Sequence, residues 1–347
     1  MILHPLLIRK LKIFGIICLF TSIVGTLFQL IDDGFISIAG PLVGFSLGLG
    51  FGLLELFFLK KLNRRLKQLP FHHLAIIKVL LYTAIVFFIS NLLGLISGYI
   101  AGKNLDQFYA SLVNPTRLAQ ILISLVMYTV IVLFLQISRL LGEGVLLKIL
   151  TGKYNKPVEE ERIFMFLDMK SSTPHAEKLG HEKFYALLNS CFHEITEPVL
   201  LTKAEIYQYV GDEIVLTWRR KDGIEDANCL RIFFLIKDKI SQKRSEYEEK
   251  YGIIPEFKAG VHFGNVIVGQ IGDLKREIVF NGDVLNTTSR IQELCNSYQK
   301  ELLISRRLLA QLKLPANYTQ EHLGSVKLKG KETEVNVFSI HSNNSRH

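Results

Sequence analysis

The chain is organised around the segment Ile163-Phe-Met-Phe-Leu-Asp168-Met-Lys-Ser-Ser-Thr173 and a later one, Tyr207-Gln-Tyr-Val-Gly-Asp212-Glu-Ile-Val215. In each, an aspartate ends or interrupts a run rich in β-branched and aromatic residues, as at the end of a strand. A carboxylate in that position can reach a hard divalent cation and the phosphates that accompany it. The two aspartates therefore predict a two-metal site.

The pattern around the aspartates predicts a strand, a helix, two hairpin strands, a helix and a strand. These elements are expected over residues 162–167, 182–200, 204–210, 213–219, about 224–250 and 256–262. Gly211-Asp212 has the chemistry of the tight hairpin turn. Pro174 suits the first turn of a short helix after the first strand, and Thr173 is expected to be its N-cap.

This β-α-β-β-α-β order is typical of the ferredoxin-like arrangement, in which the first strand lies antiparallel beside the third. The end of one strand then meets the start of the other. Asp168 is therefore expected beside Asp212, although 44 residues separate them (212 − 168). Two carboxylates this close repel each other unless a cation lies between them.

Four segments, in order along the chain, resemble the class III adenylate/guanylate cyclase catalytic domain. The resemblance covers roughly residues 160–340. The segments are Phe166-Leu-Asp168-Met-Lys-Ser-Ser-Thr173, Val210-Gly-Asp212-Glu213, Gly282-Asp-Val-Leu-Asn286-Thr-Thr-Ser-Arg290 and Val326-Lys-Leu-Lys329-Gly-Lys331.

The resemblance implies that the 3′-hydroxyl of a nucleoside triphosphate attacks the α-phosphorus, so that negative charge grows on the phosphoryl oxygens. Asn286 and Arg290 then correspond to the catalytic residues that orient the ribose and contact the α-phosphate. Since they are four apart on a predicted helix, they share a face. Lys329, with Lys331 as the alternative, resembles the lysine that holds the terminal phosphates.

The resemblance also implies two Mg²⁺ or Mn²⁺ ions per site. Asp168, Asp212 and the backbone carbonyl of Met169 would be their protein ligands. One ion is expected to activate the 3′-hydroxyl and the other to hold the β- and γ-phosphates. Asp168 can accept the proton. The backbone N–H groups of Ser171, Ser172 and Thr173, at a helix N-terminus, can bind the triphosphate.

In this family one site takes its metal ligands and its transition-state residues from different protomers. A chain with one catalytic domain must then pair head to tail with a second copy. The aspartates of one copy would face Asn286, Arg290 and Lys329 of the other. Since the chain carries all of these residues, it is expected to form a self-sufficient homodimer with two composite sites.

The positions that select the base depart from the family pattern. The adenine-binding lysine four residues before the second aspartate is Gln208 here, and the Asp or Thr seven residues before the asparagine is Val279. Gln208 can donate or accept a hydrogen bond, whereas the Val279 side chain does neither. ATP is favoured over GTP because glutamine can bind an adenine edge. A guanylate cyclase remains the alternative.

The first 140 residues contain four apolar runs that each reach or exceed the ~20 residues needed to cross a bilayer. They cover residues 13–31, 35–59, 79–101 and 118–137. Basic residues flank the first run, separate the second from the third and follow the fourth, which predicts cytoplasmic N- and C-termini. The chain is thus expected to be a multi-pass protein of the plasma membrane, or of the inner membrane of a bacterium. Gly40, Gly44, Gly48 and Gly52, four apart, predict close helix packing.

The expected architecture is a four-helix transmembrane domain followed by an α+β ferredoxin-like class III cyclase domain. The boundaries are residues 1–141, a linker or transducer over 142–160, and 161–342. The net charge of +9 arises largely from membrane-flanking residues, so anionic lipid rather than nucleic acid is the expected partner. The four cysteines lack metal-site spacing and are expected to be buried, reduced residues.

Two further hypotheses remain open from the sequence. The second domain can be a catalytically silent nucleotide-binding or dimerisation module of a receptor, since Gln208 and Val279 depart from the pattern. A diguanylate cyclase shares the strand order, but Val210-Gly-Asp-Glu-Ile214 is a poor match for its turn signature.

Overall fold

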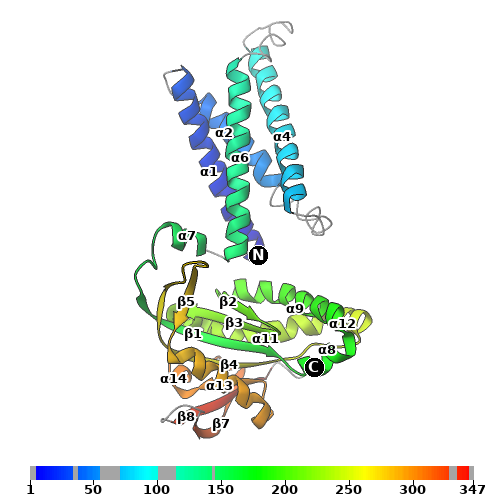
Figure 1. The fold of residues 1–347 in the computed structure, drawn as a ribbon, viewed down its shortest axis with the longest axis vertical. Helices are drawn as coiled ribbons and strands as arrows, with labels where there is room; N and C mark the ends of the chain where they lie inside the picture. Colours follow the sequence, from blue (N-terminus) through cyan, green and yellow to red (C-terminus); the bar gives the residue numbers. More distant parts are fainter. Residues whose placement is uncertain are drawn as a thin grey trace. The chain divides into compact units, whose positions relative to one another are not determined.

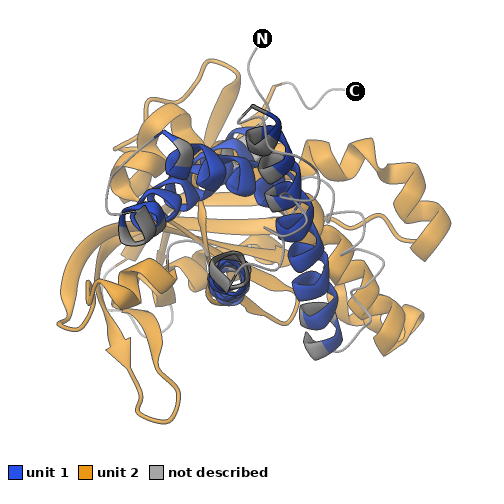
Figure 2. Cartoon of the chain, turned by 90° about the horizontal axis from the view of Figure 1, so that it is seen from above, with its two compact units in different colours: residues 1–140 blue, residues 141–347 orange. Residues whose placement is uncertain are grey.

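The structure is a computed structural model. The residues that it describes are 5–33, 38–54, 71–100, 115–142, 145–327 and 334–343. The chain divides into two compact units, residues 1–140 and 141–347, coloured separately in Figure 2.

The first unit is helical, with α1 (Pro5–Asp33), α2 (Ala39–Leu53), α4 (Phe71–Ile100) and α6 (Pro115–Leu141) (Figure 1). α1 and α2 pack backbone to backbone, as the glycine spacing predicts. A Cβ added to Gly44 would lie 2.9 Å from the Cα of Ser22, and one added to Gly48 would lie 3.0 Å from the Cα of Cys18. Only glycine permits an approach this close.

One of the described helices, α1, contains a stretch long and apolar enough to cross a membrane, Lys10–Leu27. The apolar stretches in α2, α4 and α6 are shorter: Gly40–Leu53, Ile76–Ile89 and Leu122–Ser138. The four-helix transmembrane domain therefore stays a prediction.

The second unit is built on a mixed sheet with the strand order β2-β3-β1-β4-β6-β8-β7, and β5 pairs with β4. The strands are β1 (Val158–Met169), β2 (Glu205–Val210), β3 (Glu213–Arg219), β4 (Phe257–Ile271), β5 (Glu277–Asn281), β6 (Leu302–Ser305), β7 (Tyr318–Lys327) and β8 (Glu334–Ser342). β1 lies antiparallel to both β3 and β4. The predicted ferredoxin-like pairing of the first and third strands is confirmed.

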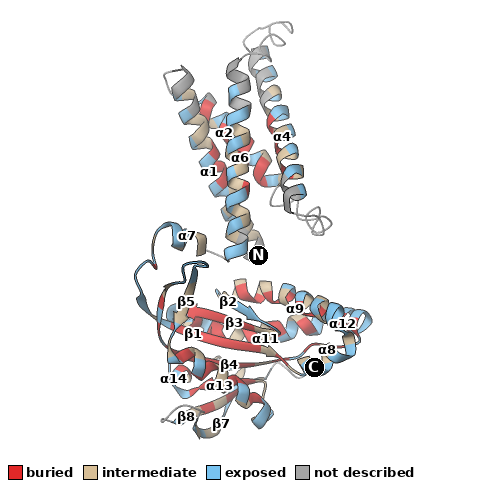
Figure 3. Cartoon of the chain, viewed as in Figure 1, coloured by how far each residue is buried: buried red, intermediate tan, exposed pale blue. Residues whose placement is uncertain are grey.

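Side chains of β1 alternate between two cores. Ile163, Met165 and Leu167 are fully buried in the larger core, with residues of α9 (His181–Leu201) and α11 (Asn228–Gln242). Phe164 and Phe166 face the other way, into a second cluster that includes Val284 of α13 (Asp283–Tyr298). Figure 3 shows β1 as a band of buried residues. Because alternate residues of a strand face opposite sides, Asp168 lies on the α13 side.

The helix expected over about 224–250 is interrupted. The structure has α10 (Arg220–Ile224), a 3₁₀ turn (Glu225–Ala227), α11, and α12 (Arg244–Tyr251). Asp226 and Ala227 adopt positive φ angles of 50° and 51°, and Lys243 lies between the last two helices. Non-helical φ angles of this kind break the i to i−4 hydrogen-bond ladder, so the single long helix was wrong.

The segment expected to be a linker is packed against the sheet. It forms α7 (Val145–Leu150) and a turn, and β1 already begins at Val158. Tyr154 is buried and donates its hydroxyl to Glu160 Oε1 at 2.9 Å. Lys148 of α7 lies 3.1 Å from Glu205 Oε2. Most of the connecting segment is therefore held by the second unit.

Candidate active site

The two aspartates meet at one edge of the sheet. Asp168 is the penultimate residue of β1 and pairs with Glu213, the first residue of β3. Asp212 directly precedes Glu213, in the two-residue turn between β2 and β3, where Gly211 has a φ of +62°. Lys258 of β4 pairs with Asp168 on its other side. The predicted juxtaposition and the predicted turn are both present.

The electrostatics of this edge are those of crowded carboxylates. Burial raises the pKa of Asp168; the hydrogen-bonded Lys258 ammonium lowers it, the charge of Asp212 raises it again, and the net result lies above the ordinary value. Burial, followed by the charges of Asp168 and Asp212, raises the pKa of Glu213 to about 7. The site is therefore short of positive charge, and a divalent cation would relieve the repulsion.

The donor set fits a hard divalent cation. Mg²⁺ is usually held by one or two carboxylates together with substrate phosphates and water, and Asp168 and Asp212 supply that number. Met169 is the last residue of β1 and is buried. No group of three or more His, Cys, Asp or Glu side chains arranged to hold a metal occurs among the described residues. The two aspartates form a smaller set, which substrate oxygens would complete.

The serine-rich segment after β1 begins α8 (Ser172–Leu179), so the N-cap predicted at Thr173 is wrong. Ser171 precedes the helix with a left-handed φ of 54°, and its side chain makes no capping bond. The helix therefore starts two residues earlier than a cap at Thr173 would place it. Ser171 and Thr173 are exposed and Ser172 is half-buried. A helix N-terminus thus lies close in sequence to Asp168.

Asn286 and Arg290 lie on the outward face of α13. The buried residues of this helix are Val284, Thr287, Thr288, Ile291, Gln292 and Cys295. At about 100° per residue, Asn286 and Arg290 fall opposite that set. Asn286 is exposed, and the guanidinium of Arg290 donates to both carboxylate oxygens of Glu293 at 2.9 Å. They therefore face away from the Asp168 of their own chain.

The strands that carry Gln208 and Val279 are joined by an aromatic contact. Gln208 is exposed on β2, and Val279 is half-buried on β5, opposite Gly269 of β4. Their chain neighbours Tyr207 and Phe280 lie edge to face, with ring centroids 4.9 Å apart. The Tyr207 hydroxyl also accepts a long hydrogen bond, 3.5 Å, from the Phe280 N–H. The two positions expected to select the base thus lie on strands of one chain that these two rings join.

Lys329 and Lys331 lie outside the described residues.

The sequence did not identify three neighbours of Asp168. Gln292 of α13 donates its amide to Asp168 Oδ2 at 2.9 Å, and Lys258 lies 3.2 Å from the same oxygen. Glu213 follows Asp212 directly, so proximity in sequence could have revealed it. Gln292 lies on the same helix as Asn286 and Arg290, but the direction of its side chain, towards Asp168, depends on how α13 packs. The position of Lys258 beside Asp168 depends on the register of β4 against β1.

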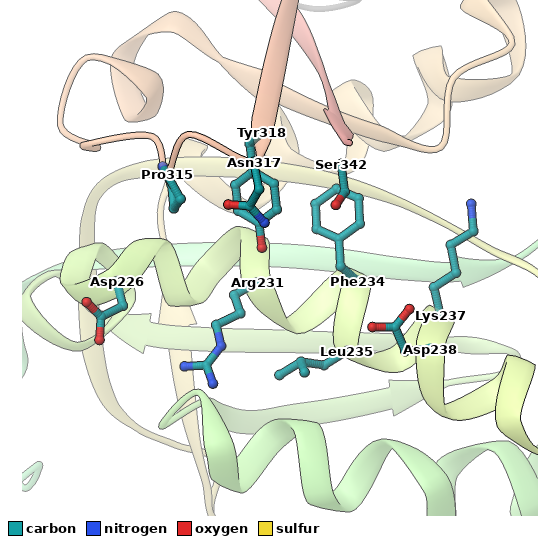
Figure 4. A pocket seen from close by; sticks show the side chains of 10 residues that line it. All are labelled: Asp226, Arg231, Phe234, Leu235, Lys237, Asp238, Pro315, Asn317, Tyr318 and Ser342. Carbon is teal, nitrogen blue, oxygen red and sulfur yellow. The ribbon is translucent and has the colours of Figure 1, made fainter. Parts of the chain in front are cut away.

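A cavity of about 330 Å³ lies elsewhere in the second unit. It is bordered by α11 and by the chain around Tyr318, and Figure 4 shows Arg231, Phe234 and Asn317 among its walls. It shares no residue with the edge at Asp168.

Comparison with known proteins gives a family match over the second unit. Residues 155–342 match the family model described as the adenylate and guanylate cyclase catalytic domain. Adenylate cyclase 2 of Rhizobium meliloti is 37% identical over 210 residues, which are 60% of this chain and 58% of that protein. Adenylate cyclase 1 of the same organism is 25% identical over 186 residues, 52% of this chain and 27% of that protein.

The chain spans less than two thirds of the length of these relatives. A solved structure of a bacterial light-regulated adenylyl cyclase superposes with a TM-score of 0.55 at 20% identity, covering 63% of this chain and 64% of that one. At that identity the likeness concerns the fold.

Proposed function

The chain belongs to the class III adenylate and guanylate cyclase family, and we propose that it is a membrane-bound cyclase that converts ATP into 3′,5′-cyclic AMP and pyrophosphate. One observation carries the proposal. Asp168 and Asp212 meet at a sheet edge, while Asn286 and Arg290 occupy the outward face of α13 in the same chain. Adenylate cyclase is also the printed name of both Rhizobium meliloti relatives.

Two Mg²⁺ or Mn²⁺ ions would be held by Asp168, Asp212 and the backbone carbonyl of Met169. When bound, they would neutralise charge on the phosphoryl oxygens and make the 3′-hydroxyl more acidic. The pKa of Asp168 is raised by burial and by the charge of Asp212 in spite of Lys258, and a divalent cation would compensate both effects, which supports this assignment. The N–H groups of residues 171–173, at the start of α8, are suited to the triphosphate.

The chemistry is a single in-line displacement. The ribose 3′-oxygen attacks the α-phosphorus, the bond to the oxygen that bridges to the β-phosphorus breaks, and pyrophosphate leaves. The hydroxyl proton passes to Asp168 or to water. Asn286 would orient the ribose, and Arg290 would leave Glu293 to bind the α-phosphate. Lys329 or Lys331 would hold the terminal phosphates.

The direction of α13 supports a head-to-tail homodimer. Because Asn286 and Arg290 point away from their own Asp168, they can serve a site only if a second copy supplies the aspartates. Two exposed apolar side chains, Tyr209 and Val210, lie just before the turn that carries Asp212. They offer a contact surface beside the site. A two-fold dimer then has two equivalent sites, each with residues from both chains.

Gln208 and Val279 would select the base from the chain that also carries Asn286, since β5 leads directly into α13. The amide of Gln208 can bind the adenine edge through both its N–H and its carbonyl. The Val279 side chain can contact the base only by van der Waals packing, because it has no hydrogen-bond donor or acceptor. ATP is therefore the proposed substrate, and GTP is the alternative in the assay below.

The side chains of the first unit support four membrane spans. Large apolar residues face outward on three of its helices: Ile16 is 68% exposed, Phe88 67% and Val126 64%. Burying such surface in lipid is favourable by about 25 cal/mol per Å². Spans near residues 13–31, 35–59, 79–101 and 118–137 would place both termini in the cytoplasm, where ATP is available, and the basic flanks against anionic lipid.

The test uses the full chain in detergent with Mn²⁺ and either ATP or GTP, and identifies any cyclic monophosphate by mass. Cyclic AMP is expected from the wild type, and neither Asp168→Ala nor Arg290→Ala alone should form it. A mixture of these two variants should recover about a quarter of the wild-type turnover, because half of the dimers are hybrids with one intact site.

The matched control is a mixture of Asp168→Ala with Asp212→Ala. Both lesions fall in the same half of the site, so no hybrid dimer contains an intact site and no recovery is expected. Equal recovery in both mixtures, or in neither, would refute the composite site. Cyclic GMP as the main product would refute the choice of ATP, and no cyclic product from the wild type would refute cyclase activity.

A further inference from the structure

Two side chains hold one oxygen of Asp168. Gln292 donates its amide to Oδ2 at 2.9 Å, and the Lys258 ammonium lies 3.2 Å from the same atom. Two donors on one oxygen restrict the orientation of the carboxylate. Because Gln292 and Lys258 both act on Oδ2, Oδ1 is the oxygen that a cation can share most easily.

The position of Gln292 is set by backbone packing. α13 lies directly on Gly260 of β4, where an added Cβ would come 2.7 Å from the Cα of Gln292. Gly260 pairs with Phe166, two residues before Asp168 on β1. Gln292 is buried, so its amide has little freedom once the helix is seated. The close approach at Gly260 therefore brings the amide within reach of the carboxylate.

The two partners of Asp168 differ in charge. The Gln292 amide orients the carboxylate without neutralising it. Lys258 brings a full positive charge, and its ammonium also donates to Asn296 Oδ1 at 3.0 Å. A cation beside a carboxylate opposes the binding of a second cation by simple electrostatics. Gln292 and Lys258 should therefore affect metal affinity in opposite directions.

We propose that Gln292 is a positioning residue for the divalent-cation site at Asp168, and that Lys258 is a resident counter-charge with which the cation competes. The inference rests on the proposed function, because it assigns the partners of a proposed metal ligand. Partners of this kind around metal ligands typically contribute 10–100-fold to metal affinity. A glutamine that only satisfied its own hydrogen bonds would affect folding stability but not cation binding.

The experiment titrates the full chain in detergent with Mn²⁺ and follows the electron paramagnetic resonance signal of the free ion. Gln292→Met keeps the size of the side chain and removes the donor, so Mn²⁺ should bind about tenfold more weakly. Lys258→Met should bind Mn²⁺ several-fold more tightly. The matched controls are Gln242→Met and Lys183→Met, the same changes at exposed helix positions, and these should bind as the wild type does.

A second measurement separates positioning from damage to the fold. In Gln292→Met, the Mn²⁺ concentration that gives half-maximal cyclase activity should rise by the same factor as the dissociation constant, while turnover at saturating Mn²⁺ is largely retained. Wild-type affinity in Gln292→Met, or a shift of both variants in one direction, overturns the inference. Should Gln292→Met fail to fold, unchanged or weaker binding in Lys258→Met overturns it. A wild type that binds Mn²⁺ but forms no cyclic nucleotide refutes the proposed function instead.

Discussion

Replacing Arg162 by methionine should destabilise the second unit strongly. The guanidinium is fully buried on β1. Its Nε donates to Glu160 Oε2 at 2.8 Å, its Nη1 donates to Glu205 Oε1 at 3.2 Å, and it lies 5.1 Å from the ring centroid of Phe280. Methionine fills much of the volume but leaves two carboxylates without their main counter-charge.

The size of the effect follows from how far those carboxylates are buried. Removing one partner of a buried ion pair costs about 3–5 kcal/mol. The side chain of Glu160 is 16% exposed and that of Glu205 is 37% exposed, so solvent screens part of the loss. We expect the free energy of unfolding to fall by about 2–4 kcal/mol. Arg220→Met is the matched control: its ion pair with Glu161 is exposed on both sides and should contribute about 0–1 kcal/mol.

The loss should depend on pH. Burial raises the pKa of Glu205, but Arg162 and Lys148 outweigh burial, so the pKa lies below the ordinary value; the pKa of Glu160 is lowered in the same way. A depressed carboxyl pKa stabilises the fold above the unfolded pKa, and this stabilisation is lost as the pH falls through the folded pKa. Without Arg162, burial becomes the dominant influence on Glu160 and Glu205 and raises the pKa of both carboxyl groups. Protonation of these groups as the pH falls therefore stabilises the variant. The difference between wild type and Arg162→Met should be largest near pH 8, should already be smaller at about pH 4.5, and should shrink further below it.

The assay can follow one fluorophore. Trp218 is the only tryptophan in the chain, it is fully buried on β3, and it pairs with Ile163 beside Arg162. Urea unfolding in detergent, followed by its fluorescence at pH 8 and pH 4.5, therefore reports on the second unit. A loss no larger than that of Arg220→Met, or a gap that stays constant with pH, would refute the reasoning.

Two further predictions concern packing. Gly260→Ala should lower the free energy of unfolding by about 1–3 kcal/mol, because the new methyl group meets the backbone of α13 at Gln292. A thermal melting curve that matches the wild type would contradict this. Burial raises the pKa of three thiols to about 12: those of Cys191, Cys229 and Cys295. These thiols should resist a disulfide reagent at pH 8 in the native chain and react once urea unfolds it. Rapid labelling of the native chain would contradict this.

Much of the candidate site follows from local sequence signals. Gly211-Asp212 has turn chemistry between two β-rich runs, so the hairpin and the place of Asp212 could be predicted. The order of the elements then placed the first strand beside the third, and with it Asp168 beside Asp212. The predicted ends of the helices were less accurate. The cap at Thr173 and the single helix over 224–250 were wrong because the positive φ angles at Ser171 and Asp226, and the non-helical backbone at Lys243, leave little trace in residue type.

The sequence alone determined the first four strands, the hairpin turn and the shared face of Asn286 and Arg290, because periodicity and turn chemistry act between residues close in the chain. Only the tertiary structure decided which face of α13 is buried, that Gln292 and Lys258 hold Asp168, and that the segment before β1 packs on the sheet. These contacts join residues far apart in sequence, through strand register and the approach of a helix to Gly260. Such packing depends on the whole assembled core and has no local signature.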